Sequence, residues 1–470
     1  MKTVRFAALF ISLLAISCGV EYKPPNLGTL YSKSAQSTDL NKNPVIVIPG
    51  ILGSKLVEKD TGQIVWGAFE KDYANPKDRE GAMLIAHPMK KGLPLSELRD
   101  NVGSDGALDR ARVRIFGLSF LLNAYINILS SLGVGGYVDE TIAEGGFVDY
   151  GDKHFTCFQF AYDWRRDNVE NAILLHEFIL EKREYIRAEF KKRYGIDKKD
   201  VRFDIVAHSM GGLITRYYLR YGNSHLPQDE DDLNITWDGA ELVDNVIIVA
   251  TPNAGSLNAL DQLVKGRKIG PFPPTYTSTI IASMPSVYQL LPRSRHLRVL
   301  DEDGNPVDIL DPGTWEKYNW GLVNEQRTDE LKKLFPKNIE EAQIKETVRD
   351  HMIKSLGRAK LFHMSLDIKA SQPEGLKLYL IAADAVDTPS VITLESETGK
   401  LILKESAPGD GTVLRASALM YERAGGNWSP RLVSPIKRSN VIFIFNDHLG
   451  MTKDPAFTDN MLYILLEQSL

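Results

Sequence analysis

A serine lies between an apolar, strand-like segment and a helix-like segment. The chain reads VRFDIVAHSMGGLITRYYL, with Ser209 between a strand-like run at 201–208 and a helix-like run at 211–221. Ala207 and Gly211 are the small residues that a sharp strand-to-helix turn requires, and such a turn holds its serine hydroxyl beyond the strand end. A lone hydroxyl is a weak nucleophile, so this position predicts acyl transfer only with a base within hydrogen-bonding distance. The simpler alternative is a serine that caps the helix.

The best-placed base is His448. It lies in IFNDHLGM, directly after the last strand-like run at 440–445, where a loop can carry an imidazole over the edge of a sheet. Chains with this kind of serine turn follow the order serine, acid, histidine. Of the nine histidines, only His448 follows the last strand. His208 is adjacent to Ser209, and we expect its side chain to point away along the turn.

The acid that orients the histidine has several candidates. Asp384 and Asp387 directly follow a strand-like run at 376–383, which simple topology favours. Asp410 lies further on, in PGDGTV, after a hairpin-like segment. We favour Asp410, because the Asp-Gly-Thr-Val turn brings backbone N–H groups to the carboxylate and a carboxylate held in this way can orient an imidazole. An ordinary turn aspartate is the alternative.

Two backbone amides could bind the oxygen on which negative charge develops during acyl transfer. One is the N–H of Met210, at the start of the helix that follows the serine. The other is the N–H of Ile51, in the loop PGILGS after the first strand-like run at 44–50, where Gly50 permits the turn. One such donor contributes on the order of 10²–10³ in rate.

Alternating strands and helices must position these groups. Strands that are apolar on both sides, separated by amphipathic helices, are typical of a mostly parallel sheet with helices on both faces. The expected strands are 44–50, 155–164, 201–208, 245–252, 376–383 and 440–445, and the expected helices are 168–194, 211–221 and one that includes 461–466. The pattern predicts an α/β-hydrolase fold whose core comprises residues 43–255 and 376–470.

The segment between the fourth and fifth strands, residues 256–375, has a different character. Prolines and tryptophans interrupt its first part, and a helical stretch follows at about 339–366. We therefore predict a cap inserted above the sheet. The length of 470 residues also favours a large domain with insertions, because a single core stops growing near roughly 250–300 residues.

The composition excludes some classes of partner. The chain is 43% hydrophobic and 25% charged, which is ordinary for a globular protein. A net charge of −5 and the lack of a block of Lys and Arg argue against nucleic acid as a partner. No Cys and His spacing suggests a metal site, and we predict no cofactor. Cys157 lies in an apolar strand and is expected to be a small buried residue.

The first 18 residues are typical of a secretory signal. Lys2 and Arg5 precede an apolar run at 6–16, which is shorter than the about 20 residues that span a bilayer. The following AISC resembles the lipobox of bacterial lipoproteins, so we predict that Cys18 is acylated and anchors the protein in the cell envelope. A periplasmic or secreted protein is the alternative. Residues 19–42 are polar and rich in Pro, Ser and Lys, which predicts a flexible tether.

A set of motifs then occurs in a distinctive order. They are PVIVIPGILGSKL, IVWGAF, AYDWRRDN, VAHSMGG, VATPNAGS, PGDGTV and NDHLGM, and they extend over about residues 44–451. Together they resemble the lecithin–cholesterol acyltransferase-like family, which includes phospholipid:diacylglycerol acyltransferases, group XV phospholipases and bacterial relatives. The resemblance selects Asp410 over Asp384. The roles that it implies are Ser209 as nucleophile, Asp410 as acid, His448 as base, and Ile51 and Met210 as oxyanion donors.

The same resemblance implies a lid after the oxyanion loop, at about residues 57–80. Family members often carry in this lid a tryptophan that contacts lipid, which makes Trp66 a candidate substrate-binding residue. A partly buried tryptophan is the alternative. In the DWR stretch, Asp163 and Arg165 are expected to brace the site.

These residues predict a serine-dependent acyl hydrolase or acyltransferase for phospholipid or acylglycerol esters at a membrane surface. Water as the second nucleophile gives a lipase or phospholipase, and a lipid hydroxyl gives an acyltransferase; both use the same catalytic residues. One alternative is an inactive surface lipoprotein that binds lipid or a partner. Another is a peptidase or thioesterase with the same fold. The sequence leaves the oligomeric state open.

Overall fold

A parallel sheet of six strands forms the centre of the molecule. The computed structural model describes residues 23–37, 40, 42–67, 73–107, 118–268, 275–294, 296, 298–421 and 434–468. The strand order is β14-β11-β7-β6-β1-β5, and every neighbouring pair is parallel. The strands are β1 (Val45–Ile48), β5 (Cys157–Gln159), β6 (Phe203–His208), β7 (Val243–Val249), β11 (Lys377–Ala383) and β14 (Asn440–Ile444). Each lies within or overlaps a predicted strand, although β5 is much shorter than the predicted 155–164.

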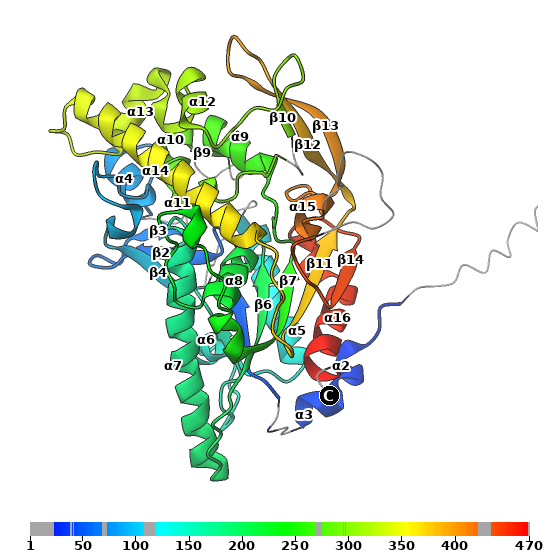
Figure 1. Cartoon of the computed structure of the whole chain (residues 1–470). Coiled ribbons are helices and arrows are strands. Elements are labelled where there is room, and N and C mark those ends of the chain that lie inside the picture. Colours follow the sequence, from blue (N-terminus) through cyan, green and yellow to red (C-terminus); the bar gives the residue numbers. More distant parts are fainter. Residues whose placement is uncertain are drawn as a thin grey trace, which may run out of the picture.

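Helices cover both faces of this sheet (Figure 1). Successive side chains of a strand point to opposite faces, so each face has its own buried cluster. On β1, Ile46 and Ile48 belong to one cluster, and Val45 and Val47 belong to the other. The helices that contribute are α7 (Asn168–Tyr194) and α8 (Met210–Tyr221) on the first face, and α5 (Leu118–Val134) and α16 (Pro455–Leu466) on the second. This arrangement is the predicted α/β-hydrolase architecture.

The longest helix of the core has the predicted bounds. Asp167 caps the start of α7 by accepting a hydrogen bond from the N–H of Val169. Gly195 ends the helix with a φ of 68°, a left-handed conformation typical of a C-terminal cap. The residues predicted to form its core-facing side are all buried: Val169, Ala172, Leu175, Ile179, Ile186 and Phe190.

Residues 256–375 contribute helices that lie over one end of the sheet (Figure 1). These helices are α9 (Leu257–Lys265), α10 (Ser278–Ile281), α11 (Pro285–Tyr288), α12 (Pro312–Lys317), α13 (Thr328–Lys333) and α14 (Glu341–Asp367). The same segment contains the short strands β8 (Arg267–Lys268), β9 (Thr275–Tyr276) and β10 (Arg298–Leu300). We refer to this segment as the cap.

The cap is joined firmly to the core. The last of these cap helices, α14, ends against α8, where Arg216 donates a hydrogen bond to the carbonyl of Leu366 and Arg220 donates to those of Ser365 and Ile368. Strand β10 pairs with β12 (Val386–Leu394), which forms an antiparallel hairpin with β13 (Leu401–Gly409). This is the hairpin-like segment expected before Asp410.

Two predicted loops are more ordered than expected. The predicted tether at 19–42 contains two short helices, α2 (Leu27–Leu30) and α3 (Ser32–Gln36). Between them, Tyr31 is 1% exposed and donates a hydrogen bond of 2.7 Å to the Asp459 carboxylate on α16. The tether prediction is therefore wrong for this part, because a buried aromatic residue fixes the segment to the core.

The predicted lid at 57–80 is also a packed structure in its described part. Strands β2 (Ser54–Glu58), β3 (Ile64–Trp66) and β4 (Val102–Ala107) form a small antiparallel sheet, and α4 (Arg79–Ile85) follows. Residues 68–72 lie outside the described residues. The remaining elements are α6 (Glu140–Glu144) and α15 (Arg415–Leu419).

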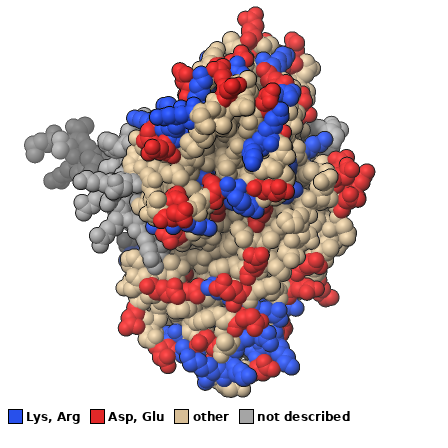
Figure 2. All heavy atoms as spheres, turned by 90° about the vertical axis from the view of Figure 1, so that its left-hand side faces the viewer, with Lys and Arg blue, Asp and Glu red and all other residues tan. Residues whose placement is uncertain are grey.

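The surface carries charges of both signs. Figure 2 shows acidic and basic side chains interspersed over one face, with basic side chains gathered at the lower end. In the last turn of α7, which contains Lys191, Lys192 and Arg193, Glu189 forms an ion pair with Arg193. Within the part of the chain that is described, no helix combines the length and the apolar character needed to cross a bilayer.

Two buried histidines make the stability of the fold depend on pH. His351 on α14 donates from Nε2 to the Ser283 carbonyl at 2.7 Å, and its ring lies 5.9 Å from that of His87. Burial lowers the pKa of His351 to about 4 and the pKa of His87 well below its ordinary value. A histidine in the unfolded chain takes up its proton near pH 6.5. The contribution of the neutral, buried histidines to the free energy of unfolding is therefore complete above pH 6.5 and is lost as the pH falls towards 4.

We predict that His351→Gln makes the free energy of unfolding less sensitive to acid. Between pH 7 and pH 5 the free energy of unfolding of the wild type should fall by about 2 kcal/mol more than that of the variant. The reason is that only the wild type has His351, which takes up a proton when the chain unfolds at pH 5. Urea unfolding at both pH values measures the difference whatever the variant's absolute stability. The exposed His225→Gln variant is the control and should behave as wild type. Equal losses in His351→Gln and wild type would contradict the prediction.

Candidate active site

Ser209 occupies a strained turn between β6 and α8. Its φ is 54° and its ψ is −125°, a conformation that L-residues adopt at an energetic cost and that is concentrated at functional sites. The turn leaves no room beside it, because a Cβ atom at Gly211 would lie 2.5 Å from the carbonyl oxygen of Pro49. The Ser209 side chain makes no capping hydrogen bond to α8, which disfavours the alternative that it is an ordinary helix cap.

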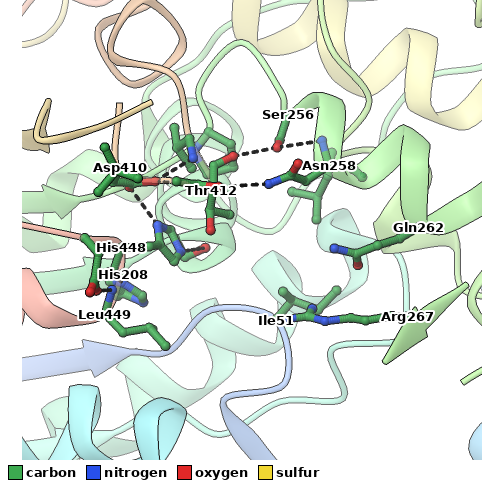
Figure 3. Close-up of a pocket in the computed structure, with 18 of the residues that line it drawn as sticks. Ile51, His208, Ser256, Asn258, Gln262, Arg267, Asp410, Thr412, His448 and Leu449 are labelled. Atoms are coloured by element: carbon green, nitrogen blue, oxygen red, sulfur yellow. Dashed lines mark hydrogen bonds and ion pairs between the residues drawn. The ribbon is translucent and has the colours of Figure 1, made fainter. Parts of the chain in front are cut away.

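The structure brings Ser209, His448 and Asp410 into one hydrogen-bonded row. Figure 3 shows the contact between His448 and Asp410. The distance from Ser209 Oγ to His448 Nε2 is 3.2 Å, and that from His448 Nδ1 to an Asp410 carboxylate oxygen is 2.8 Å. Because the carboxylate can only accept at Nδ1, the proton of a neutral imidazole lies there. Nε2 is then free to accept from the serine hydroxyl.

The turn after β13 holds the Asp410 side chain in place. Asp410 is 3% exposed, and its second carboxylate oxygen accepts from the backbone N–H groups of Thr412 and Val413 at 2.8 and 2.6 Å. The competing aspartates lie elsewhere. Asp384 forms an ion pair with Arg415 at 2.8 Å, and Asp387 is exposed. Of the candidate acids, only Asp410 contacts His448 in the described residues.

The loop after β1 passes directly beside the serine. A Cβ atom at Gly50 would lie 2.7 Å from Ser209 Cβ, and the Gly53 N–H closes the turn by donating to the Gly50 carbonyl. Ile51 follows and lines the pocket. Among the described residues, the N–H groups of Ile51 and Met210 have no hydrogen-bond acceptor. Both are therefore available to an oxygen atom of a bound molecule.

Tyr125, which the sequence did not single out, and His208 connect the two sides of this site. The hydroxyl of Tyr125 on α5 accepts from the Gly50 N–H at 2.8 Å and lies 3.3 Å from His208 Nδ1. His208 Nε2 lies 3.2 Å from the backbone carbonyl of His448. All of these hydrogen bonds can form at once if the Tyr125 hydroxyl donates to His208 Nδ1 and the His208 Nε2–H donates to the His448 carbonyl.

His208 thus points away from the serine hydroxyl, as expected, but it supports the loop that carries His448. Burial lowers the pKa of His208 to about 3, so the ring stays neutral near pH 7 and keeps this pattern of hydrogen bonds. Tyr125 lies in a helix without a recognisable motif, and its role depends on contacts 75 and 83 residues away along the chain. No local signal could have identified it.

A pocket of about 450 Å³ opens over the serine. Figure 3 shows His448 and Leu449 on one side of it and residues of the cap on the other. Apolar residues from core and cap line it, including Ile51, Val287 and Leu290. The polar side chains on the cap side are Ser256, Asn258, Gln262 and Arg267. Its size is typical of sites for small organic ligands.

Trp66 is not part of this pocket. Its side chain is 1% exposed, its indole N–H donates to the Leu52 carbonyl at 2.9 Å, and its ring packs edge-on against Trp164 and Tyr276. The expectation that Trp66 contacts substrate is corrected here to its alternative, because the indole is a core residue. In the described part of 57–80, no residue lines the pocket.

Asp163 and Arg165, which were expected to brace the site, form a buried ion pair that does not line the pocket. The Arg165 side chain is fully buried and donates two hydrogen bonds to the Asp163 carboxylate at 3.0 and 2.8 Å. It also donates to the carbonyls of Leu84 and Ala86 at the end of α4. The arginine thereby ties the loop after β5 to α4.

The chain has two cysteines, Cys18 and Cys157. Cys157 is buried on β5, as predicted, and burial raises the pKa of its thiol. Cys18 and the signal segment 1–18 lie outside the described residues. In the part of the chain that the structure describes, no group of three or more His, Cys, Asp or Glu side chains could hold a metal ion.

We predict that Tyr125→Phe slows the reaction of Ser209 with a fluorophosphonate probe about tenfold. The variant leaves the Gly50 N–H and His208 Nδ1 without a partner, and it thereby weakens the contacts that hold the two loops of the site. We expect the barrier to the reaction to rise by about the free energy of one buried hydrogen bond. Tyr218→Phe is a matched control, since the buried hydroxyl of Tyr218 has no hydrogen-bond partner among the described residues. Equal labelling rates in the two variants would refute the role assigned to Tyr125.

Comparisons with known proteins concern the family and the fold. The profile of the family described as lecithin:cholesterol acyltransferase matches residues 144–364, a range that includes Ser209 but not Asp410 or His448. No curated protein sequence matches the chain significantly.

Similar solved structures extend the comparison to the fold. The crystal structure of the Tle4–Tli4 complex contains a chain with a TM-score of 0.56 and 16% identity, over 91% of this chain and 98% of that one. EstA from Clostridium botulinum has a TM-score of 0.32 and 12% identity, over 92% of this chain and 88% of that one. Phospholipase PlaB from Legionella pneumophila has a TM-score of 0.31 and 12% identity, over 74% of this chain and 58% of that one.

The first of these structures supports the fold over nearly the whole chain, and the family profile supports the resemblance expected from the motifs. The protein therefore has an α/β-hydrolase fold, and its residues 144–364 match the profile of the lecithin:cholesterol acyltransferase family.

Proposed function

We propose that this protein is a serine-dependent acyl hydrolase or acyltransferase that acts on lipid esters through an acyl-enzyme on Ser209. The observation that carries the proposal is the hydrogen-bonded row from Ser209 through His448 to Asp410, with distances of 3.2 and 2.8 Å. The family resemblance and the largely apolar pocket beside the serine support a lipid substrate.

In the first half of the reaction, the Ser209 hydroxyl attacks the carbonyl carbon of the ester. His448 Nε2 takes up the hydroxyl proton, and the Asp410 carboxylate stabilises the imidazolium that forms. The N–H groups of Ile51 and Met210 bind the oxygen on which negative charge develops. The protonated His448 then gives its proton to the leaving alkoxide, and the acyl group remains on Ser209.

In the second half, His448 deprotonates a second nucleophile, which attacks the acyl-enzyme and frees Ser209. Water yields a fatty acid, and an alcohol yields a new ester. The catalytic residues are the same in both cases, so the outcome depends on which nucleophile the pocket admits. We favour hydrolysis, alone or together with transfer, because nothing around the pocket identifies an alcohol acceptor.

The acid can be tested with a matched pair of aspartates. Asp410→Asn should lower kcat on a chromogenic fatty ester by about 10³–10⁴-fold, because the amide can no longer hold His448 in the required tautomer. Asp384→Asn should remain within about twofold of wild type, since Asp384 pairs with Arg415 instead. The reverse result would transfer the role of the acid to Asp384.

The nucleophile can be tested by labelling and turnover together. Wild type should react with a fluorophosphonate probe and hydrolyse the ester, and Ser209→Ala should do neither. If wild type showed neither reaction, the alternative of an inactive lipid- or partner-binding protein would be favoured. Cleavage of peptides or thioesters in preference to lipid esters would point to the other alternative class.

The second nucleophile is identified by the products. With labelled phospholipid in the presence and absence of an alcohol acceptor, we expect free fatty acid in both samples. Acylated alcohol that requires Ser209 would show transfer as well. Free fatty acid alone, at every acceptor concentration, would rule out the transferase.

We further propose that Cys18 carries lipid and holds the protein at a membrane of the cell envelope. Two or more acyl chains suffice for stable anchoring. Since α2 and α3 are docked on the core, only residues 19–26 would separate the lipid from the folded body. Mass spectrometry of the mature N-terminus should find acylated Cys18, and an unmodified N-terminus at another residue would contradict the proposal.

A further inference from the structure

A single arginine of the cap extends into the pocket. Arg267 lies in β8, directly after Gly266, which ends α9 with a φ of 89°. The strand is paired with β9, where Arg267 is opposite the buried Tyr276. Figure 3 shows the Arg267 side chain extending from β8 towards Ile51, on the side of the pocket opposite His448. The backbone of this arginine is therefore anchored while its guanidinium faces the cavity.

Among the described residues, the guanidinium of Arg267 has no counter-ion. No side chain or carbonyl of the described residues accepts a hydrogen bond from it or forms an ion pair with it, although it is partly buried. Burial accordingly lowers the pKa of Arg267. A guanidinium withdrawn from water without a partner is unfavourable, and an arginine is normally retained in such a place with an anion to bind.

The carboxylates near the pocket are already engaged. Asp410 accepts from His448 and from two backbone N–H groups. Asp447 accepts from the backbone N–H groups of Leu449 and Gly450. Asp261 on α9 forms an ion pair with Lys265, which does not line the pocket. The cation of Arg267 is thus left for a ligand.

A neighbouring amide offers further hydrogen bonds on the same wall. Gln262 lies on α9 and faces the pocket, and neither atom of its side-chain amide has a hydrogen-bond partner among the described residues. Asn258, one turn earlier, donates to the Gly411 carbonyl and is occupied. Together, Gln262 and Arg267 form a polar wall on the side of the pocket opposite His448 (Figure 3).

We propose that Arg267, assisted by Gln262, binds the phosphodiester of a glycerophospholipid whose acyl ester lies at Ser209. This inference rests on the proposed function and narrows its substrate class to phosphorus-containing lipids over neutral acylglycerols. A guanidinium matches the oxygens of a phosphate in a bidentate pair. Because Arg267 and Ser209 line one cavity of about 450 Å³, a single glycerophospholipid, whose phosphate and acyl ester are a few bonds apart, reaches both.

Other anions fit the arrangement less well. The carboxylate of a fatty acid product would form at the serine, next to the N–H groups of Ile51 and Met210, and not across the pocket at Arg267. A neutral acylglycerol has no group to pair with the guanidinium and would leave it desolvated and unsatisfied, which selects against that substrate.

Binding can be measured without turnover. In the Ser209→Ala background, a short-chain diether phosphatidylcholine should bind more tightly than the matching dialkylglycerol, and Arg267→Gln should weaken phosphatidylcholine binding roughly tenfold to a hundredfold. Arg267→Lys should restore part of the loss. Lys265→Gln removes a nearby cation at the end of α9, outside the pocket, and should have no effect. Inorganic phosphate should compete only weakly, because it lacks the apolar part.

Turnover supplies the second readout in proteins that retain Ser209. The ratio of kcat/KM for dihexanoyl phosphatidylcholine to that for dihexanoylglycerol should fall at least about tenfold in Arg267→Gln and should be unchanged in Lys265→Gln. Circular dichroism and thermal unfolding of each variant report on folding. A wild type that binds the diether through Arg267 but cleaves neither ester would refute the proposed function and leave this inference standing.

Three results would overturn the inference. The first is equal binding of phosphatidylcholine by the Arg267→Gln and Lys265→Gln variants. The second is an equal loss of both substrates in Arg267→Gln, which would give Arg267 a structural role. The third is inorganic phosphate binding as tightly as the phospholipid in an Arg267-dependent manner, which would identify a site for free phosphate instead of a lipid headgroup.

Discussion

The backbone strain at Ser209 is the constraint around which the site is organised. A serine with a φ of 54° stays in that conformation only because its surroundings leave no alternative. The N–H of Ser209 donates to the Val249 carbonyl on β7, and its own carbonyl accepts from the Thr251 hydroxyl. Gly50 and Gly211 bring the loop after β1 against the other side of the turn. The central sheet and its first loop thus hold the hydroxyl at the floor of the pocket, where it needs no cap from α8.

The second organising feature is the connection between the oxyanion loop and the histidine loop. These loops follow the strands β1 and β14, which are separated in the sheet by β6, β7 and β11. Tyr125 and His208 bridge the distance with hydrogen bonds to Gly50 and to the backbone of His448. Since both groups are buried and uncharged near pH 7, the bridge introduces no charge next to the imidazole that must become protonated. The proposed oxyanion loop and the loop that carries the proposed base His448 are in this way held by one set of contacts.

The cap supplies one wall of the pocket, which we propose distinguishes substrates. The core contributes the reactive groups, whereas the polar side chains of α9 and β8 face them across the pocket (Figure 3). The position of this wall depends on the attachment of the cap, through Arg216 and Arg220 to the end of α14 and through β10 to the β12–β13 hairpin. That hairpin leads directly into the Asp410 turn. The cap segment that lines the pocket and the turn whose Asp410 contacts His448 are therefore parts of one continuous structure.

The sequence by itself predicted the positions of the six strands, the bounds of α7, and Ser209 and His448, because hydrophobic period, turn residues and chain order can be read from it. The choice of Asp410 over Asp384 also needed the family resemblance. It did not determine the contacts that depend on distant segments. Tyr31 turned a polar, loop-like stretch into a docked segment, and the packing of Trp66 against Trp164 and Tyr276 made a predicted substrate contact into a core residue. Arg267 belongs to the same class, since nothing in a short charged stretch reveals that its guanidinium will face a cavity without a counter-ion. Burial and the identity of a partner are properties of the folded chain, and only the tertiary structure decided them.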